Sequence, residues 1–558
     1  MHAHRGRPRA IGLVSGALLA LALLAPATGR AACHVKVAEL PVRMVGMRAM
    51  ATVVINGQDV PLFVDTGAFF SFLNEAAAAQ LDLATHRQPG LRVQGLVGGV
   101  SVKLTTVEHL KLSKGSLTHV DFIVGGNEMG SGSMGLIGRN LLNFADTEYD
   151  LAHGMIRFVY PNDECEKTNM TYWADDPGTV ASVDLLYDFD REFNRQALRA
   201  TARLNGKDVD VMFDTGATTT VSLDAAKKAG VKEHDMTPEG DMYGAGRGTA
   251  RQWTAAFEHF ELGGEVINNN RLKVADFDLN DAEMLVGVDF FLSHHVYVSA
   301  QQKRMYFTYN GGPVFRLNKA EHASAAAPAA ASPEEPLGAD AALRRGAASR
   351  ARGDFAGALA DLDRACALAP QNATCFTTRA SAHEGLEQKP QALADLDTAL
   401  RLDPRLGDAR IRRAWMLHED DKDDAVLADL DELDRTLAPQ SQIRSSMADL
   451  FAELRLPARV VAQLDQWIQF HPHDIELADA YDERCWARVK LNAALDKALA
   501  KDSKMTNSLY GRGVALARLG NTGASQADFA AATKLRPDMD HHMRELGLSA
   551  DQIEGAHP

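Results

Sequence analysis

Two aspartates that end two nearly identical segments are the residues whose type and spacing suggest chemistry. The segment "INGQDVPLFVDTGA" (Ile55–Ala68) returns as "LNGKDVDVMFDTGA" (Leu204–Ala217), with eight of the fourteen paired positions identical. Each copy ends an apolar run in Asp-Thr-Gly-Ala, which predicts that Asp65 and Asp214 lie in turns that follow strands. Two copies of one unit can bring their carboxyl groups to a shared interface.

A pair of carboxyl groups about 3 Å apart cannot both ionise, so the pair keeps one proton over a broad acidic range. The ionised member can take a proton from a trapped water, while the protonated member donates to the carbonyl oxygen under attack. This is chemistry for hydrolysing a peptide bond, without a covalent intermediate, metal or other cofactor. The pattern therefore predicts Asp65 and Asp214 as a catalytic dyad.

The duplication extends beyond the two acidic turns. The offset of 149 residues between Asp65 and Asp214 also carries "GLIG" (Gly135–Gly138) onto "MLVG" (Met284–Gly287), and "MIRFVY" onto "RMYFTY". A single Asp-Thr-Gly is an ordinary turn sequence and would favour a structural interpretation. Its recurrence, each time 73 residues before the glycine of an apolar-apolar-Gly element, favours a functional one.

Each unit is predicted to be rich in β-strands. Both begin with alternating or apolar runs around an Asn-Gly turn, which is a hairpin signal. A short helix-like stretch follows each acidic turn, "NEAAAAQLDL" in one copy and "SLDAAKKAGV" in the other. The glycine-rich stretches "VQGLVGGVSVKL" and "YGAGRGTARQW" come next and are predicted to be hairpin tips.

In these motifs the chain resembles the retropepsin-like aspartic proteases of bacteria, with both lobes in one polypeptide. The resemblance covers roughly residues 40–309 and rests on "FVDTGA" with "GLIGRNLL" and on "MFDTGA" with "LVGVDFF". It implies two all-β lobes, catalytic roles for Asp65 and Asp214, and a peptide or protein substrate. It also implies threonine hydroxyls that bond across the lobes and glycines that let the backbone approach the carboxylates. These dyad-supporting residues are Thr66, Gly67, Thr215 and Gly216.

The resemblance also implies a flap at each glycine-rich hairpin, closing over an extended peptide by strand addition. The implied flap and substrate-binding residues are Gly95, Gly98, Tyr243 and Gly244. Tyr243 is the only aromatic residue near either tip, so it is a candidate substrate contact. The alternative for these glycines is an ordinary exposed turn.

The chain departs from the family pattern at several positions beside the turns. Ala68 and Ala217 stand where pepsin carries Ser or Thr, and loss of that hydroxyl is expected to raise the apparent pKa values of the dyad. We therefore expect activity from mildly acidic to near-neutral pH. Arg139 has Val288 as its counterpart in the second unit, and "DTGAFFSFL" carries two bulky Phe residues, so substrate preference is open.

Residues 1–32 have the features of a secretory signal peptide rather than of a folded element. The basic "MHAHRGRPR" precedes a sixteen-residue apolar run (Ala10–Ala25), and "PATGRAA" supplies a helix breaker and small residues for cleavage. The sequence thus predicts an exported protein, periplasmic if the host has two membranes, with no stable membrane span after cleavage. Lipid attachment at Cys33 is less favoured, because Arg30 stands where such signals carry an apolar residue.

The five cysteines are compatible with export. Cys33 and Cys165 bracket the first unit and could pair, as could Cys366 and Cys375. The alternative is that they are small buried apolar residues. The sequence contains no Cys-x-x-Cys or clustered His pattern, so no metal site is predicted.

The C-terminal part is helical and repeats every 34 residues. "ADLDRACALAP" (Ala360–Pro370) recurs as "ADLDTALRLDP" (Ala394–Pro404), and small residues recur at the same spacing. This part resembles the tetratricopeptide repeats, which implies a solenoid whose groove holds a protein partner. A degenerate copy, "ERCWARVKLNAALDKALA", precedes the last clear copy. The predicted segments are a signal peptide (1–32), lobe 1 (33–165), lobe 2 (176–312), an Ala/Pro-rich linker (313–338) and the repeats (339–540).

Two functions of different classes are compatible with this organisation. The first is an exported aspartic endopeptidase whose repeats recruit substrate or a partner. The second is a non-catalytic scaffold that binds peptides or proteins through the repeats. Both aspartates are intact, which favours the enzyme. A formal net charge of −15 argues against nucleic acid as a partner.

Overall fold

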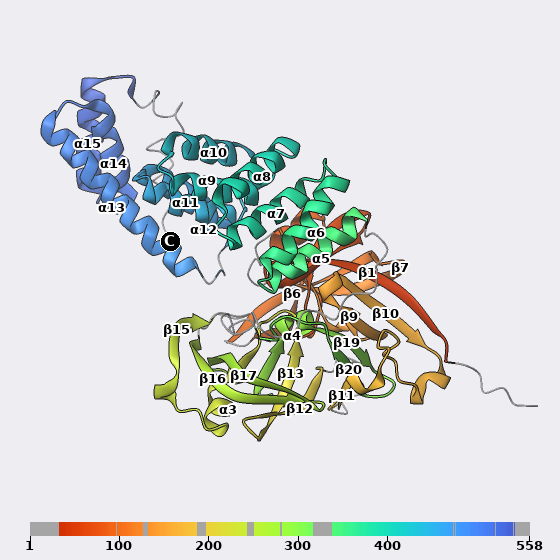
Figure 1. The fold of residues 1–558 in the computed structure, drawn as a ribbon. Coiled ribbons are helices and arrows are strands. Elements are labelled where there is room, and N and C mark those ends of the chain that lie inside the picture. Colours follow the sequence, from red (N-terminus) through yellow and green to blue (C-terminus); the bar gives the residue numbers. More distant parts are fainter. Residues whose placement is uncertain are drawn as a thin grey trace, which may run out of the picture.

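The computed structural model describes residues 33–95, 98–125, 132–186, 197–242, 250–278, 282–315, 338–471, 474, 476–518, 521–539 and 541. Two β-rich lobes come first, and a series of helices extends away from them (Figure 1). This confirms the predicted fold class, duplicated β lobes followed by an all-α repeat region. The predicted signal peptide and most of the predicted linker lie outside the described residues.

Lobe 1 is built from β-hairpins, one of which has the Asn-Gly turn predicted from the sequence. Asn56 and Gly57 join two strands, and both have positive φ, at 49° and 87°. Asn and Gly tolerate that left-handed conformation, which suits the twist of a two-residue hairpin. The elements are β1 (Val35–Val45), β2 (Arg48–Ile55), β3 (Gln58–Val64), β4 (Phe72–Leu73), α1 (Glu75–Gln80), β5 (His86–Gly95), β6 (Gly98–Leu112), β7 (Gly115–Val124), β8 (Gly135–Ile137), α2 (Arg139–Leu142), β9 (Asp146–Asp150), η1 (Leu151–His153) and β10 (Met155–Pro161).

Lobe 2 repeats this plan. Asn205 and Gly206 form the equivalent turn, with φ of 49° and 75°. A connecting segment carries η2 (Asp163–Lys167), η3 (Pro177–Thr179) and β11 (Ala181–Asp184). The lobe consists of β12 (Arg199–Leu204), β13 (Lys207–Asp214), β14 (Thr220–Ser222), α3 (Leu223–Lys228), η4 (Glu233–Asp235), β15 (Thr237–Met242), β16 (Ala250–Leu262), β17 (Glu265–Ala275), β18 (Met284–Gly287), α4 (Val288–Ser293), β19 (His294–Ser299) and β20 (Arg304–Tyr309).

The two lobes share one sheet. Strands β19 and β20 of lobe 2 join β9 and β10 of lobe 1, so one sheet runs β11-β20-β19-β9-β10-β1 and continues into lobe 1. In the β9–β19 pair Glu148 lies opposite Tyr297, its own counterpart 149 residues later. The pseudo-two-fold axis of the duplication therefore passes through this pair. The buried Glu148 carboxylate accepts a hydrogen bond from Tyr172 at 2.7 Å and lies 2.8 Å from the Nε2 atom of His295.

Both cysteine pairings that the sequence left open are present. Cys33 and Cys165 are disulfide-bonded and tie the start of lobe 1 to η2. Cys366 and Cys375 are also disulfide-bonded, within the helical region. Cys485 is a free thiol and is exposed.

The helical region stacks helix pairs with the predicted 34-residue period. The small residues at that spacing lie where helices approach closely: Ala380, Ala414 and Ala448 are fully buried. A Cβ atom on Gly346 would lie 2.7 Å from Cγ of Leu362. The helices are α5 (Ala339–Ala351), α6 (Phe355–Leu368), α7 (Ala373–Gly385), α8 (Lys389–Leu402), α9 (Gly407–His418), α10 (Asp423–Thr436), α11 (Ile443–Glu453), α12 (Pro457–Phe470), α13 (Leu477–Lys501), α14 (Thr506–Arg518) and α15 (Thr522–Leu535).

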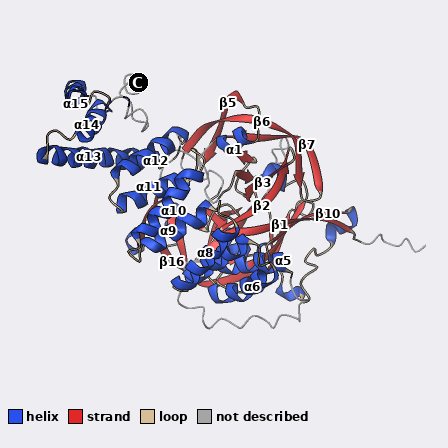
Figure 2. Cartoon of the chain, turned by 90° about the horizontal axis from the view of Figure 1, so that it is seen from above, coloured by secondary structure: helices blue, strands red, loops and turns tan. Residues whose placement is uncertain are grey.

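The degenerate copy forms one helix of 25 residues, α13, instead of a helix pair. Its sequence contains no Gly or Pro that would end a helix part-way. The helices beyond it, α14 and α15, lie farthest from the lobes (Figures 1 and 2).

The first repeat helix packs directly on the lobes. Ala347, Ala348 and Ala351 of α5 belong to the same buried apolar cluster as the lobe residues. Gly154 of lobe 1 makes this approach possible, because its φ is +67° and a Cβ there would lie 2.5 Å from Cβ of Arg344. Figure 1 shows α5 beside β1.

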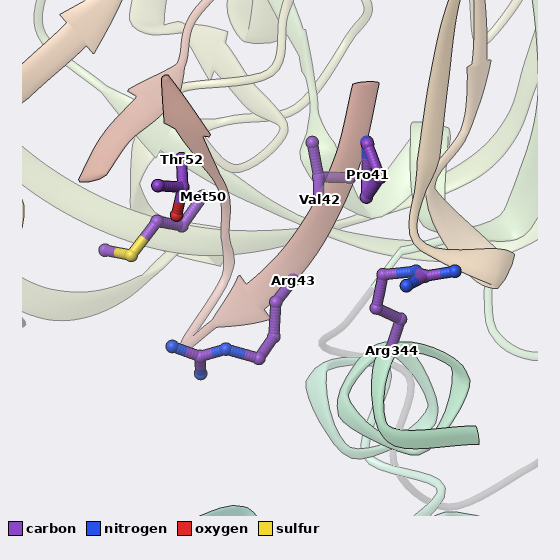
Figure 3. A pocket seen from close by; sticks show the side chains of 6 residues that line it. All are labelled: Pro41, Val42, Arg43, Met50, Thr52 and Arg344. Atoms are coloured by element: carbon purple, nitrogen blue, oxygen red, sulfur yellow. The ribbon is translucent and has the colours of Figure 1, made fainter. Parts of the chain in front are cut away.

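A cavity of about 320 Å³ lies at this junction between lobe 1 and α5 (Figure 3). Its walls include two arginines, Arg43 from β1 and Arg344 from α5, whose guanidinium groups point to different sides (Figure 3). The other lining residues are Pro41, Val42, Met50 and Thr52.

Candidate active site

Parallel strand pairs place the two acidic turns. In lobe 1, β3 runs parallel to β8, and the backbone N–H of Asp65 donates to the Ile137 carbonyl at 3.0 Å. In lobe 2, β13 pairs with β18 in the same way, with Asp214 opposite Gly287. The chain after each turn passes tightly over the glycine of the apolar-apolar-Gly element. A Cβ on Gly287 would lie 2.3 Å from the Thr219 nitrogen, so only glycine fits there.

The two turns are locked together by reciprocal threonine hydrogen bonds. The backbone N–H of Thr66 donates to Oγ1 of Thr215, and the N–H of Thr215 donates to Oγ1 of Thr66, both at 3.0 Å. Each hydroxyl then donates to the opposite lobe, to the Phe213 carbonyl at 2.9 Å and the Val64 carbonyl at 3.0 Å. Both threonines are fully buried. The arrangement fixes the spacing of the two aspartates.

Each glycine of the two motifs lies against the carboxyl group of the other lobe. A Cβ on Gly67 would lie 2.4 Å from Cγ of Asp214, and one on Gly216 would lie 2.5 Å from Cγ of Asp65. Any side chain here would push the carboxyl groups apart. This is the close backbone approach that the resemblance implied for these glycines.

The carboxyl groups of Asp65 and Asp214 are hydrogen-bonded to each other. Asp65 Oδ1 also accepts from the Ala68 N–H at 2.9 Å, and Asp214 Oδ1 accepts from the Gly216 N–H at 2.8 Å. Burial raises the pKa of Asp65. Burial and the charge of Asp65 raise the pKa of Asp214 well above its usual range. The two carboxyl groups therefore share one proton.

Polar pairs that were not predicted brace each turn from the side. Oδ1 of Asn140 accepts from the Ser71 N–H at 2.6 Å and from its hydroxyl at 2.8 Å. In lobe 2, Oδ1 of Asp289 accepts from the Thr219 N–H at 3.0 Å and from its hydroxyl at 2.6 Å. Asn140 and Asp289 keep the offset of 149, whereas Ser71 and Thr219 are 148 apart. Lobe 1 thus has one more residue in this flank, which contains the two Phe residues.

Arg139 is a buried arginine whose charge interacts with both aspartates of the dyad. The residue is 7% exposed, and its Nε and Nη1 atoms have no hydrogen-bond partner. Its Cζ atom lies over the Phe69 ring, 5.7 Å from the ring centre. Burial lowers the pKa of Arg139, while the charges of Asp65 and Asp214 raise it. The sequence showed the asymmetry with Val288 but could not show that the guanidinium is buried and unpaired.

Only part of the predicted flap region can be placed. Gly95 and Gly98 face each other at the end of the β5–β6 hairpin, consistent with a hairpin tip. Tyr243 and Gly244 lie outside the described residues, as does the rest of the second tip, residues 243–249. In the described part of the chain, no helix is both long and apolar enough to cross a membrane.

The comparison with protein families agrees with this geometry. The model of the aspartyl protease family matches residues 51–141 and 200–290, the two segments that carry the dyad. Each lobe thus contains one segment that matches the aspartyl protease family model. No match was found among curated proteins.

Several solved structures are similar to parts of the chain. Basic 7S globulin from soybean is 12% identical, with a TM-score of 0.28, and the match covers 49% of this chain and 95% of the globulin. A thermophilic TPR protein from Thermus thermophilus is 20% identical, with a TM-score of 0.24, and the match covers 27% of this chain and 84% of that protein. A tetratricopeptide repeat protein from Parabacteroides merdae is also 20% identical, with a TM-score of 0.24, and the match covers 40% and 84%.

Proposed function

We propose that the protein is an exported aspartic endopeptidase that uses Asp65 and Asp214 to activate a water molecule against a peptide bond. The observation that carries this proposal is the hydrogen-bonded carboxyl pair at the pseudo-two-fold interface, held by the reciprocal threonine bonds. An inactive scaffold has no need to hold two carboxyl groups in mutual contact, since the arrangement raises their pKa values at a cost in folding free energy.

A pair that shares one proton has one acidic and one basic member, and the effect of the Asp65 charge in raising the pKa of Asp214 supports Asp214 as the acid. The ionised Asp65 takes a proton from the water as the water oxygen attacks the carbonyl carbon of the peptide bond. Asp214 protonates the carbonyl oxygen, giving a neutral tetrahedral intermediate. Asp65 then gives its proton to the leaving nitrogen, the C–N bond breaks, and a hydroxyl of the intermediate returns a proton to Asp214, which leaves a carboxylic acid, an amine and a dyad with one proton. Because the raised pKa keeps this proton in place as pH increases, we expect activity to extend from mildly acidic to near-neutral pH.

The repeats are proposed to recruit the substrate or a protein partner. The direct packing of α5 on the lobes supports this, because a partner held by the repeats stays in a fixed relation to the dyad. A concave helical solenoid is a common binding surface for peptides and helices.

Export is supported by the signal-peptide features of residues 1–32 and by the two disulfides, which persist in oxidising compartments. The Cys33–Cys165 bond also argues against the lipid-anchored alternative, because a sulfur atom in a disulfide cannot carry a thioether-linked lipid.

The proposal is tested by peptide cleavage with the chain from Cys33 onward. A mixed peptide library is incubated from about pH 3.5 to about pH 7.5, the range over which a carboxyl pair titrates. We expect cleavage that is abolished in Asp65→Asn and in Asp214→Asn. Thermal unfolding of each variant checks that the lobes remain folded.

The same experiment decides against the alternative function. Cleavage that persists in both Asn variants would assign it to another residue or to a contaminant. No cleavage at any pH, with folded protein, would favour a scaffold that binds peptides or proteins.

A further inference from the structure

Arg139, the cation beside the dyad, is buried without hydrogen bonds that would offset the cost of burying its charge. The Nε and Nη1 atoms of Arg139 make no hydrogen bond, although the residue is only 7% exposed. Burying a charged group without hydrogen bonds is costly, and buried arginines are normally paired with a carboxylate or phosphate. No ion pair of Arg139 occurs among the described residues.

The dyad itself does not supply the missing acceptor. Asp65 and Asp214 interact with Arg139 through their charge, but their oxygen atoms bond to each other and to backbone N–H groups. The neighbour in contact with the guanidinium is the ring of Phe69, which offers a cation–π contact but no hydrogen-bond acceptor. The Nε and Nη1 donors thus remain available next to the proposed catalytic pair.

The site occurs on one side of the interface only. Lobe 2 carries Val288 in place of Arg139 and Thr218 in the flank where lobe 1 has Phe69. Phe69 is 47% exposed and lies over the guanidinium, so a ligand that moves this ring reaches the unpaired nitrogens. A peptide bound across the dyad would therefore meet the Arg139 guanidinium on its lobe 1 side, whereas the equivalent position of lobe 2 is the uncharged Val288.

We propose that Arg139 is a specificity-determining residue that binds a carboxylate side chain of the substrate, so that the protease selects peptides with an acidic residue on the lobe 1 side of the cleaved bond. This inference rests on the proposed endopeptidase function. A planar carboxylate matches the guanidinium donors, and the charge-assisted bonds form where little water competes for them.

The test compares paired peptides that differ only in Glu or Gln. A cleaved library peptide is resynthesised with Glu, and separately with Gln, at each position in turn. The kcat/KM values are measured at about pH 6, where a Glu side chain is ionised. We expect about tenfold or greater preference for Glu at one position, a size typical of a desolvated charge pair. The ratio should fall to about one in Arg139→Met and be partly kept in Arg139→Lys, which retains the charge but not the fork.

The Glu-to-Gln ratio separates recognition from structural support. Poor folding or a shifted dyad pKa in Arg139→Met lowers both values together and leaves the ratio unchanged. Arg48→Met is the matched control, because Arg48 is another cation that interacts with Asp65 but lies over Phe63. It is expected to keep the Glu preference.

Failure of this inference is distinct from failure of the proposed function. Cleavage that is lost in Asp65→Asn but shows no Glu preference, or a preference that survives Arg139→Met, overturns the role of Arg139 alone. Without any cleavage, binding of fluorescent Glu and Gln peptides to the protein and to Arg139→Met decides the matter. Tighter binding of the Glu peptide that depends on Arg139 supports the site, and equal binding overturns it.

Discussion

The hydroxyl groups of Thr66 and Thr215 explain why both acidic motifs contain threonine. Each hydroxyl accepts a backbone N–H and donates to a carbonyl across the interface, so it uses both its donor and an acceptor. Serine offers the same bonds without the methyl group, and valine keeps the shape without the bonds. The position thus allows a direct measurement of what the reciprocal bonds contribute.

Replacing Thr66 with Val should destabilise the lobes by about 2 kcal/mol or more, since it leaves the Thr215 N–H and the Phe213 carbonyl without this buried partner. Urea denaturation followed by circular dichroism measures the free energy of unfolding. Thr66→Ser is the control and should cost less, because it keeps the hydroxyl. Equal losses in the two variants would show that the methyl group, not the hydrogen bonds, holds the interface.

The residues of the dyad could be predicted from the sequence, but their surroundings could not. Asp65 and Asp214 are identified by duplication, a signal that is local and repeated. The bracing of the turns by Asn140 and Asp289 depends on chains that meet only in the fold. Whether the Arg139 guanidinium has hydrogen-bond partners depends on the groups that surround it in the fold, and a sequence does not show those neighbours.

Among the elements, those predicted correctly were fixed by local chemistry. The Asn-Gly hairpins follow from residues that tolerate positive φ, and the repeat helices follow from a short period. The β9–β19 pairing that unites the lobes joins segments about 150 residues apart, beyond the reach of any local pattern. The extra residue in the flank of lobe 1 does not change the overall offset between the two units, because the equivalent positions Gly138 and Gly287 are again 149 residues apart.

The repeat helices are joined by a ladder of Arg–Asp pairs that follows the 34-residue period. Arg379 bonds Asp395 of its own repeat at 2.8 and 2.6 Å, and Asp363 of the preceding repeat at 2.8 Å. Arg413 repeats this arrangement with Asp429 and Asp397. The common spacing of 16 residues is visible in the sequence, although the pairing itself requires the packed helices.

We expect the two aspartates bound to Arg379 to differ in their contribution. The Asp395 side chain is 7% exposed and pairs in a bidentate manner, so Asp395→Asn should lower the free energy of unfolding of the repeats by about 2 kcal/mol. Asp363 is 65% exposed, and Asp363→Asn should cost less than about 1 kcal/mol. Urea denaturation of both variants measures this difference. A larger loss for Asp363→Asn would mean that contact between repeats outweighs burial.

In the whole molecule, the lobes and the repeats form one packed unit. An Ala/Pro-rich linker does not by itself hold two parts of a chain in a fixed relation. The contact comes instead from Ala347, Ala348 and Ala351 of α5, which are part of the apolar core of the lobes. The α5 helix also bonds to both lobes, from Arg350 to the Gly46 carbonyl and from Arg352 to the Leu292 carbonyl.

A protein nicked in the linker should therefore stay together. A specific protease site inserted within residues 316–337 allows the chain to be cut after folding, and size-exclusion chromatography reports whether the two parts co-elute. We expect co-elution, and separation when Ala348→Asp places a carboxylate in the buried contact. Ala341→Asp is the control on the same helix, at a partly exposed position, and should leave the parts together. Separation of the nicked parent protein would mean that the linker, and not α5, holds the repeats beside the proposed catalytic pair.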